Sequence, residues 1–157
     1  MNFDQAFDRL IGNEGGYVNN PADPGGETKF GISKRTYPDV DIASLTLEQA
    51  KAIYKRDYWD RAKADQYDGQ IGFQLFDTAV NSGVDRAIRI LQAAVGVMAD
   101  GKVGPATLAA IAALKPVVVA ARMNAERLDF MSSLGSWDHF GRGWAKRIAA
   151  NLRQLEG

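Results

Sequence analysis

Cysteine is absent from the 157 residues, and His139 is the only histidine. The first absence excludes disulfide bonds and thiol chemistry. With one histidine and no cysteine, a zinc site would consist mostly of carboxylates, which is an unusual ligand set for zinc. A zinc amidase or metallopeptidase is therefore not expected, and we predict neither a metal site nor a cofactor.

An excess of charge is also missing, because 19 Lys and Arg side chains balance 19 Asp and Glu. Without a strong positive field, nucleic acid is not an expected partner. The apolar run over 116–122 is far too short to span a membrane. Residues 1–10 carry acids and lack the basic and apolar regions of a signal peptide. We therefore expect synthesis in the cytoplasm, with no membrane span.

What the sequence does contain is apolar residues at helical spacing, beginning with Phe3, Ala6, Phe7, Leu10 and Ile11. Between 17 and 32, dense Gly, Pro, Asn and Asp residues predict a small β-hairpin or irregular lobe. We predict a mainly α protein, an α+β fold with a helical bundle and a small β-hairpin lobe after the first helix. The predicted helices cover 3–11, 46–59, 71–81, 85–95, a short segment from 104, 116–134 and 140–155.

Glu14 is the first candidate for catalysis, because it follows the predicted helix 3–11 on glycine-rich backbone. The negative end of a helix dipole disfavours an ionised carboxylate, and a general acid must stay protonated near neutral pH. The flanking glycines have no side chains to keep a polymeric substrate away. Taken alone, however, a Glu in a loop is usually surface charge.

Asp23 and Thr28 lie in the turn-rich segment, and a hairpin folding back over the first helix would place them across a cleft from Glu14. In an inverting glycosidase a second carboxylate activates water about 6.5–9.5 Å from the acid. Asp23 is the candidate for that carboxylate, and the Thr28 hydroxyl for holding the water. The alternative is that Asp23 forms a turn before Pro24 and Thr28 is an ordinary strand residue.

Two motifs carry a resemblance to a known family. Glu14-Gly15-Gly16-Tyr17 and the run DPGGETKFGI over 23–32 resemble the opening of glycoside hydrolase family 108, muramidases of phage and bacterial origin. The segments 54–59 and 76–83 are similar to that family too. The resemblance implies a lysozyme-like α+β fold with Glu14 as the catalytic acid. The order Glu, Asp, Thr also resembles phage-type lysozymes, which implies the roles given above to Asp23 and Thr28.

Four further residues are predicted to bind substrate: Tyr17, Tyr58, Asp77 and Asn81. Asp77 and Asn81 share one helix face, and an Asn amide can donate to and accept from an N-acetyl group or a sugar hydroxyl. Tyr17 belongs to the first motif, and the ring of Tyr58 can stack on a sugar. The alternatives are that Asn81 caps the following turn and that Tyr58 belongs to the core.

A second resemblance covers the end of the chain. Leu91-Gln92, Gly96-Val97 and the run DGKVGPATL over 100–108 resemble small helical peptidoglycan-binding modules. Physically this pattern is a helix, a tight Asp-Gly turn and a helix that begins with proline, which is scaffold chemistry. We therefore predict a lysozyme-like catalytic subdomain over 1–90 and a closely packed peptidoglycan-binding-like subdomain over 91–157.

Together these features predict a monomeric muramidase that hydrolyses the β-1,4 bond between N-acetylmuramic acid and N-acetylglucosamine. Peptidoglycan is the expected partner, and export through a holin or other pore would bring the protein to the cell wall or periplasm. Two other interpretations stay open. A lytic transglycosylase needs the same acid but no activated water, and a non-catalytic peptidoglycan-binding protein needs neither.

Overall fold

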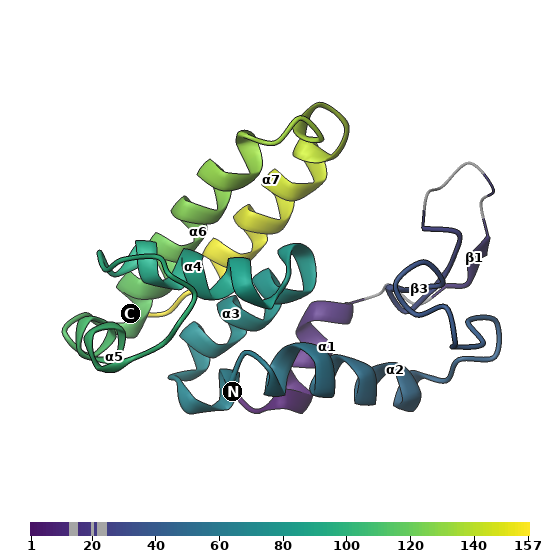
Figure 1. Ribbon diagram of the computed structural model, residues 1–157, viewed down its shortest axis with the longest axis horizontal. Helices are drawn as coiled ribbons and strands as arrows, with labels where there is room; N and C mark the ends of the chain where they lie inside the picture. The colour runs from purple at the N-terminus through teal and green to yellow at the C-terminus, as the bar shows by residue number, and fades with distance from the viewer. Residues whose placement is uncertain (13–15, 20, 22–24) are drawn as a thin grey trace. The chain divides into compact units, whose positions relative to one another are not determined.

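The computed structural model describes residues 1–12, 16–19, 21 and 25–157 (Figure 1). The chain forms two compact units, one of Asn2–Asp57 and one of Tyr58–Gly157 together with Met1. The smaller unit holds the first helix, the sheet and the second helix. The larger unit contains helices and short helical turns in its described residues.

Helix α1 (Phe3–Ile11) opens the smaller unit, as its apolar stripe predicts. Asn2 accepts a hydrogen bond from the Gln5 backbone N–H and the Gln5 side chain accepts one from the Asn2 N–H, which forms a capping box. The helix ends at Gly12, whose φ of 53° lies in the left-handed region that glycine adopts without strain. Glu14 therefore follows this helix cap by two residues in sequence.

A three-stranded antiparallel sheet follows, with β1 (Val18–Asn19), β2 (Glu27–Lys29) and β3 (Ile32–Ser33) in that order. The predicted β lobe is confirmed, with one strand more than a hairpin. Gly31 joins β2 to β3 at a φ of 78°, and the Tyr54 hydroxyl lies against it and donates to the Phe30 carbonyl at 2.9 Å. A side chain at Gly31 would meet that hydroxyl, so the turn requires glycine.

Helix α2 (Leu47–Tyr54) begins with a second capping box, between Thr46 and Gln49, as the sequence predicts. It continues into η1 (Lys55–Asp60), a π-helix, and a short 3₁₀ turn, η2 (Ala64–Gln66), follows. The predicted helix over 46–59 therefore has the right extent, but its last turns are wound more widely. The border between the two units falls within η1.

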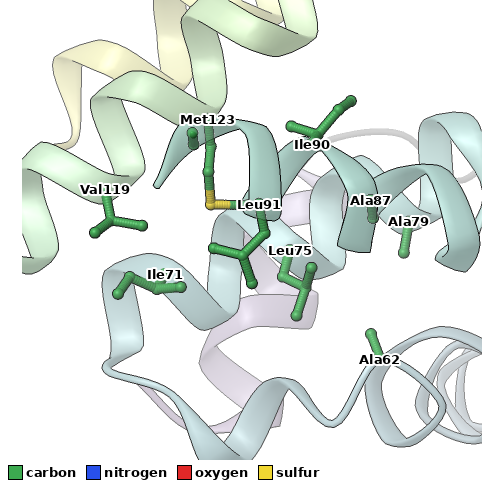
Figure 2. Packing of buried hydrophobic residues seen from close by; sticks show 10 residues of the cluster. Ala62, Ile71, Leu75, Ala79, Ala87, Ile90, Leu91, Val119 and Met123 are labelled. Atoms are coloured by element: carbon green, nitrogen blue, oxygen red, sulfur yellow. The ribbon is translucent and has the colours of Figure 1, made fainter. Parts of the chain in front are cut away.

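The larger unit is built around α3 (Gly69–Ser82), in which every residue from Ile71 to Ala79 is buried. Around it lie α4 (Val84–Ala94) and α6 (Pro116–Ser132), and Figure 2 shows apolar side chains from all three meeting in one cluster. Helices α5 (Pro105–Ala112) and α7 (Trp137–Arg153) complete the unit, and α7 runs beside α6 (Figure 1). Both α5 and α6 begin with proline, which is tolerated at the first position of a helix.

The expected fold class is confirmed: the protein is mainly helical with a small antiparallel sheet early in the chain, a lysozyme-like α+β arrangement. Within the described ranges, no single helix has the length and hydropathy needed to cross a membrane. The pair α5 and α6 meets those criteria only when taken together, and the two are bent by 115°.

The turn between α4 and α5 is organised by the side chain of Gln92, which is fully buried. Its Nε2 donates to Asp100 Oδ1 and to the Lys102 carbonyl, both at 2.9 Å, and its Oε1 accepts from the Gly101 N–H at 2.9 Å. The Lys102 N–H also donates to Asp100 Oδ1, and these hydrogen bonds lower the pKa of Asp100. The Asp-Gly turn of the second motif is thus a scaffold element held by one amide.

We expect Gln92→Ala to lower the free energy of unfolding by about 2 kcal/mol, because the groups that Gln92 satisfies would be left without partners. Thermal or urea unfolding measures this. Gln154→Ala is the control, since Gln154 is exposed just after α7. If both variants unfold at the same midpoint as the unaltered protein, Gln92 does not organise this turn.

Candidate functional site

Two of the predicted catalytic residues, Glu14 and Asp23, lie outside the described residues. The third, Thr28, is half-buried on the central strand β2. It lies opposite Val18 on one side and Ser33 on the other. Since β1 pairs with β2 through Asn19 and Glu27, Asp23 falls in sequence within the connection between these two strands. A role of Thr28 in holding water stays a prediction.

Tyr17 lies next to β1, and its side chain is 43% exposed. Its hydroxyl donates to Glu27 Oε2 at 2.6 Å, and this hydrogen bond to the carboxylate raises the pKa of Tyr17. The contact links the residue that precedes β1 to the first residue of β2. The ring of Tyr17 remains accessible while its hydroxyl is engaged, so any contact with substrate would use mainly the ring.

Tyr58 is half-buried and packs against the apolar cluster of the larger unit. Its neighbours in the aromatic stripe, Tyr54 and Trp59, are buried at 2% and 4% exposure. Trp59 meets Phe76 of α3 edge to face, with ring centroids 5.4 Å apart. The stripe therefore contributes to packing, and a contact of Tyr58 with sugar stays a prediction.

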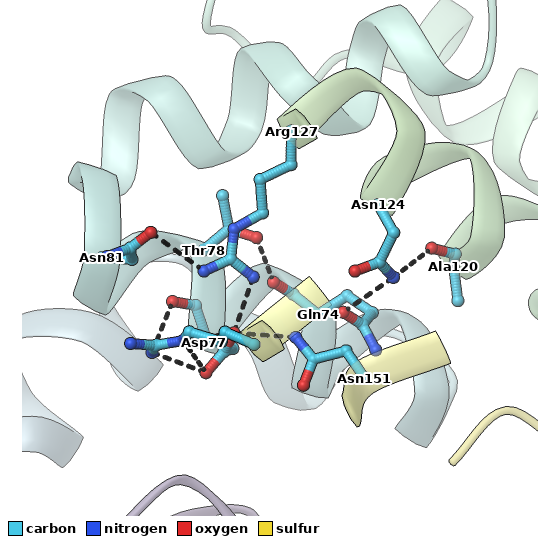
Figure 3. Close-up of polar contacts among 9 residues, drawn as sticks. Gln74, Asp77, Thr78, Asn81, Ala120, Asn124, Arg127 and Asn151 are labelled. Atoms are coloured by element: carbon cyan, nitrogen blue, oxygen red, sulfur yellow. Dashed lines mark hydrogen bonds and ion pairs between the residues drawn. The ribbon is translucent and has the colours of Figure 1, made fainter. Parts of the chain in front are cut away.

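Asp77 lies near the middle of α3 and is 3% exposed. Its Oδ2 accepts from Arg127 Nη1 of α6 at 2.6 Å and from Asn151 Nδ2 of α7 at 2.9 Å (Figure 3). Its Oδ1 accepts from Arg147 Nη2 of α7 at 2.7 Å. One carboxylate thus holds three helices together, and these partners occupy its oxygens. The geometry gives Asp77 a structural role, and a direct contact with substrate stays a prediction.

The charge state of Asp77 follows from competing effects. Burial raises its pKa, but the positive charges of Arg147 and Arg127 and their hydrogen bonds outweigh burial and lower the pKa from 3.8 to about 2. Asp77 is therefore ionised at neutral pH. Two guanidinium groups face one carboxylate, and the Arg147 side chain is 33% exposed while that of Arg127 is 1% exposed.

Asn81 lies one turn beyond Asp77, close to the end of α3, and is half-buried. Its Oδ1 accepts from Arg127 Nη2 at 3.1 Å (Figure 3). A guanidinium has donors and no acceptor, so Arg127 fixes the amide with its oxygen inward. The Asn81 Nδ2 has no hydrogen-bond partner within the described part of the chain. The same arginine therefore joins the buried carboxylate to a candidate substrate-binding residue.

Arg127 was not among the residues predicted from the sequence, although its position carries a signal. Buried residues of α6 recur at Val119, Met123, Arg127 and Met131, so a charged side chain continues an apolar stripe. Asp77 similarly interrupts the apolar stretch of α3. A charge within a buried stripe requires a partner of opposite charge, and these two side chains supply it to each other.

A search of the described ranges finds no cluster of three or more His, Cys, Asp or Glu side chains that could hold a metal ion. The candidate residues in the described part of the chain offer carboxylate, amide, hydroxyl and aromatic groups. These are the groups with which proteins recognise sugars by hydrogen bonding and stacking.

Comparison with known proteins agrees with this picture. The family model described as Glycosyl hydrolase 108 matches residues 7–83, and the one described as Predicted Peptidoglycan domain matches residues 86–149. The structure of Brucella abortus SagA is similar over the whole chain, with 32% sequence identity and a TM-score of 0.87. The similarity covers 98% of this chain and 92% of that one. A comparison with curated protein sequences finds no significant match.

The lysozyme-like fold and these matches define a glycoside hydrolase that acts on peptidoglycan. The chain belongs to the glycosyl hydrolase 108 family and carries a C-terminal predicted peptidoglycan domain. Both regions contribute to the network around Asp77, because α3 lies in the first match and Arg127 and Arg147 lie in the second.

The lowered pKa of Asp77 makes stability depend on pH. A carboxyl group with a folded-state pKa of about 2 contributes stability that is present above its unfolded pKa near 4 and is lost as pH falls through about 2. We expect the unaltered protein to lose about 2 kcal/mol of unfolding free energy from this group between pH 5 and pH 2. Asp77→Asn should lose less over that range.

At pH 7 Asp77→Asn should be destabilised by about 3–5 kcal/mol, because the Arg127 charge would remain buried without its counter-ion. Asp85→Asn is the control, since Asp85 forms an exposed pair with Arg89 and its side chain is 71% exposed. That variant should change stability by less than about 1 kcal/mol. Equal pH profiles for unaltered protein and Asp77→Asn in urea unfolding would contradict the role of Asp77.

Proposed function

We propose that this protein is a muramidase that hydrolyses the β-1,4 bond between N-acetylmuramic acid and N-acetylglucosamine, with Glu14 as the general acid. The observation that carries the proposal is the Glycosyl hydrolase 108 match over residues 7–83. It spans Glu14, Asp23 and Thr28 as well as the candidate substrate-binding residues Tyr17, Tyr58, Asp77 and Asn81. No cofactor is needed for this chemistry.

The local sequence supports Glu14 as the acid. It follows α1 by two residues beyond the Gly12 cap, where the carbonyl end of the helix dipole disfavours negative charge. A carboxyl group kept protonated in this way can give its proton to the glycosidic oxygen as the bond breaks. The neighbouring Gly15 and Gly16 leave room for a polymer at that position.

Hydrolysis also needs an activated water, and Asp23 and Thr28 are the proposed groups for it. Thr28 lies on β2, and Asp23 belongs in sequence to the connection between β1 and β2. Asp23 would remove a proton from the water and the Thr28 hydroxyl would hold it in place. Without such a water the same acid would catalyse transglycosylation, so these two residues decide between the two products.

Asn81 is proposed to recognise the substrate as a hydrogen-bond donor. Because Arg127 holds its amide oxygen, Nδ2 is the group left for a ligand. Its natural partners are acceptors, such as the carbonyl oxygen of an N-acetyl group or a carboxylate oxygen. In this account Asp77 holds Arg127, and Arg127 in turn positions Asn81. Asp77 would therefore contribute to substrate binding only indirectly, without contacting the sugar.

We further propose that residues 1–90 carry the catalytic function and residues 91–157 hold the protein on peptidoglycan. The Predicted Peptidoglycan domain match over 86–149 supports the second role. In this account the protein works as a monomer at the cell wall or periplasm, and a holin or other pore brings it there.

Glu14→Gln should reduce lysis of purified cell walls by about 10²–10⁴-fold, because the variant keeps the shape of the side chain and lacks the proton to donate. The decrease in turbidity of a wall suspension measures the rate. Circular dichroism should show an unchanged helical content.

Glu48→Gln is the matched control, since Glu48 is exposed in the first turn of α2 and its loss of charge is the same. It should lyse walls at the unaltered rate. Full lytic activity in Glu14→Gln, or equal losses in both variants, would contradict the assignment of Glu14.

Asn81→Asp tests the donor role of Asn81. One oxygen of the new carboxylate can still accept from Arg127, so the thermal midpoint should be unchanged or higher. The other oxygen replaces the Nδ2 donor with an acceptor at the position that faces the ligand. We expect KM for solubilised peptidoglycan to rise about tenfold, with a smaller change in kcat. Gln154→Glu makes the same amide-to-carboxylate change at an exposed position and should leave KM unchanged. An unchanged KM in Asn81→Asp would exclude the donor role.

A further inference from the structure

Three aromatic rings lie together on the first two turns of α7. Trp137 and Trp144 have ring centroids 6.1 Å apart, and Phe140 stacks on Trp144 at 5.7 Å with an angle of 28° between the planes. His139 adds an edge contact to Phe140 at 4.5 Å. We call Trp137, Phe140 and Trp144 the α7 aromatic cluster.

The cluster is held in a fixed arrangement by a glycine. A Cβ atom at Gly141 would lie 2.5 Å from Trp137 Cε2, so the indole of Trp137 lies directly against the helix backbone one turn on. Any other residue at 141 would push that ring away. A pre-arranged ring loses little conformational freedom when a ligand covers it, which favours binding.

The cluster is also open. Phe140 is 51% exposed, and Trp137 and Trp144 are half-buried. Further along α7, Ile148 and Asn151 lie on the same helical face at spacings of four and seven from Trp144 and are buried. One face of α7 is therefore buried in the core near the end of the helix, whereas at the beginning of the helix the same face carries partly exposed aromatic rings. Apolar side chains exposed next to one another are a feature of interaction sites.

We propose that the α7 aromatic cluster binds the glycan strand of peptidoglycan by stacking on its sugar rings, with residues other than those assigned to catalysis. This inference rests on the proposed function, because it takes the same polymer as ligand. The apolar faces of pyranose rings stack on aromatic side chains. The ring of Phe140, 51% exposed and supported by Trp144, offers such a surface. The Predicted Peptidoglycan domain match over 86–149 includes the whole cluster.

The charges around the cluster favour the same ligand. Helix α7 carries four basic side chains and one acidic one, and Arg142 and Lys146 lie exposed beside the cluster. Peptide stems and lactyl groups give peptidoglycan carboxylates, which such cations attract. The match to a Predicted Peptidoglycan domain favours a glycan strand over a lipid surface as the ligand of this cluster.

Phe140→Ala is the main test, since this ring is the most exposed of the three and its loss should leave the fold intact. Binding is measured by sedimentation of the full chain with purified cell-wall sacculi, with Glu14→Gln as the background so that the walls are not degraded. We expect affinity to fall about tenfold in Phe140→Ala and to return in Phe140→Trp. Leu152→Ala on the same helix, at an apolar residue 43% exposed, should bind normally.

Unchanged binding of Phe140→Ala to sacculi would overturn the proposal. So would Phe140-dependent sedimentation with phosphatidylglycerol and phosphatidylcholine vesicles in place of sacculi. Equal losses in Phe140→Ala and Leu152→Ala would also overturn it, since the effect would not belong to the cluster. Failure of the muramidase assignment is seen separately, because the unaltered protein would then bind sacculi without lysing them.

Discussion

The buried carboxylate of Asp77 is the interaction on which the larger unit depends. It lies inside α3, where a charge without partners would be strongly unfavourable, and it is satisfied by Arg127 of α6 and by Arg147 and Asn151 of α7. Apolar packing around Ile71, Leu75 and their neighbours brings the helices together. The ion pairs and hydrogen bonds to one carboxylate add a constraint on the helix register, because they require each partner at one position.

This interaction also connects the two regions of the chain that match the two family models. Helix α3 belongs to the Glycosyl hydrolase 108 match and Arg127 and Arg147 to the Predicted Peptidoglycan domain match, yet all of them lie in one compact unit. The hydrolase region is therefore completed by side chains from the second region. Arg127 also donates a hydrogen bond to Asn81 Oδ1 near the end of α3 and so fixes the orientation of that amide. In our account the wall-binding region thereby helps to set the orientation of a substrate-binding amide.

Much of the fold could be predicted because its signals are local. The apolar stripe from Phe3, the capping box at Thr46 and the helix-starting prolines each determine an element through neighbouring residues alone. The π-helical turns of η1 and the third strand were not predicted, since both depend on packing against distant residues such as Phe76 and Tyr54. The Asp77 network has the same origin, with partners 50 and 70 residues away.

For the candidate site, the sequence indicated residue types and order, while their roles depend on geometry. Asn81 was expected to donate and accept, and only the contact with Arg127 shows which end of the amide is occupied. The exposure of the aromatic residues at the start of α7 could not be predicted from their spacing, because the same helical face is buried further along. The proposed roles of Glu14 and Asp23 rest on the local sequence, the motifs and the family.

The central claim is hydrolysis of a glycosidic bond in peptidoglycan, and mass spectrometry of the soluble products of digested peptidoglycan tests it most directly. Our account predicts fragments that end in a reducing N-acetylmuramic acid, with one water added for each bond cleaved. Fragments carrying a 1,6-anhydro ring, which are lighter by that water, would contradict it, as would the release of no fragments by a correctly folded protein.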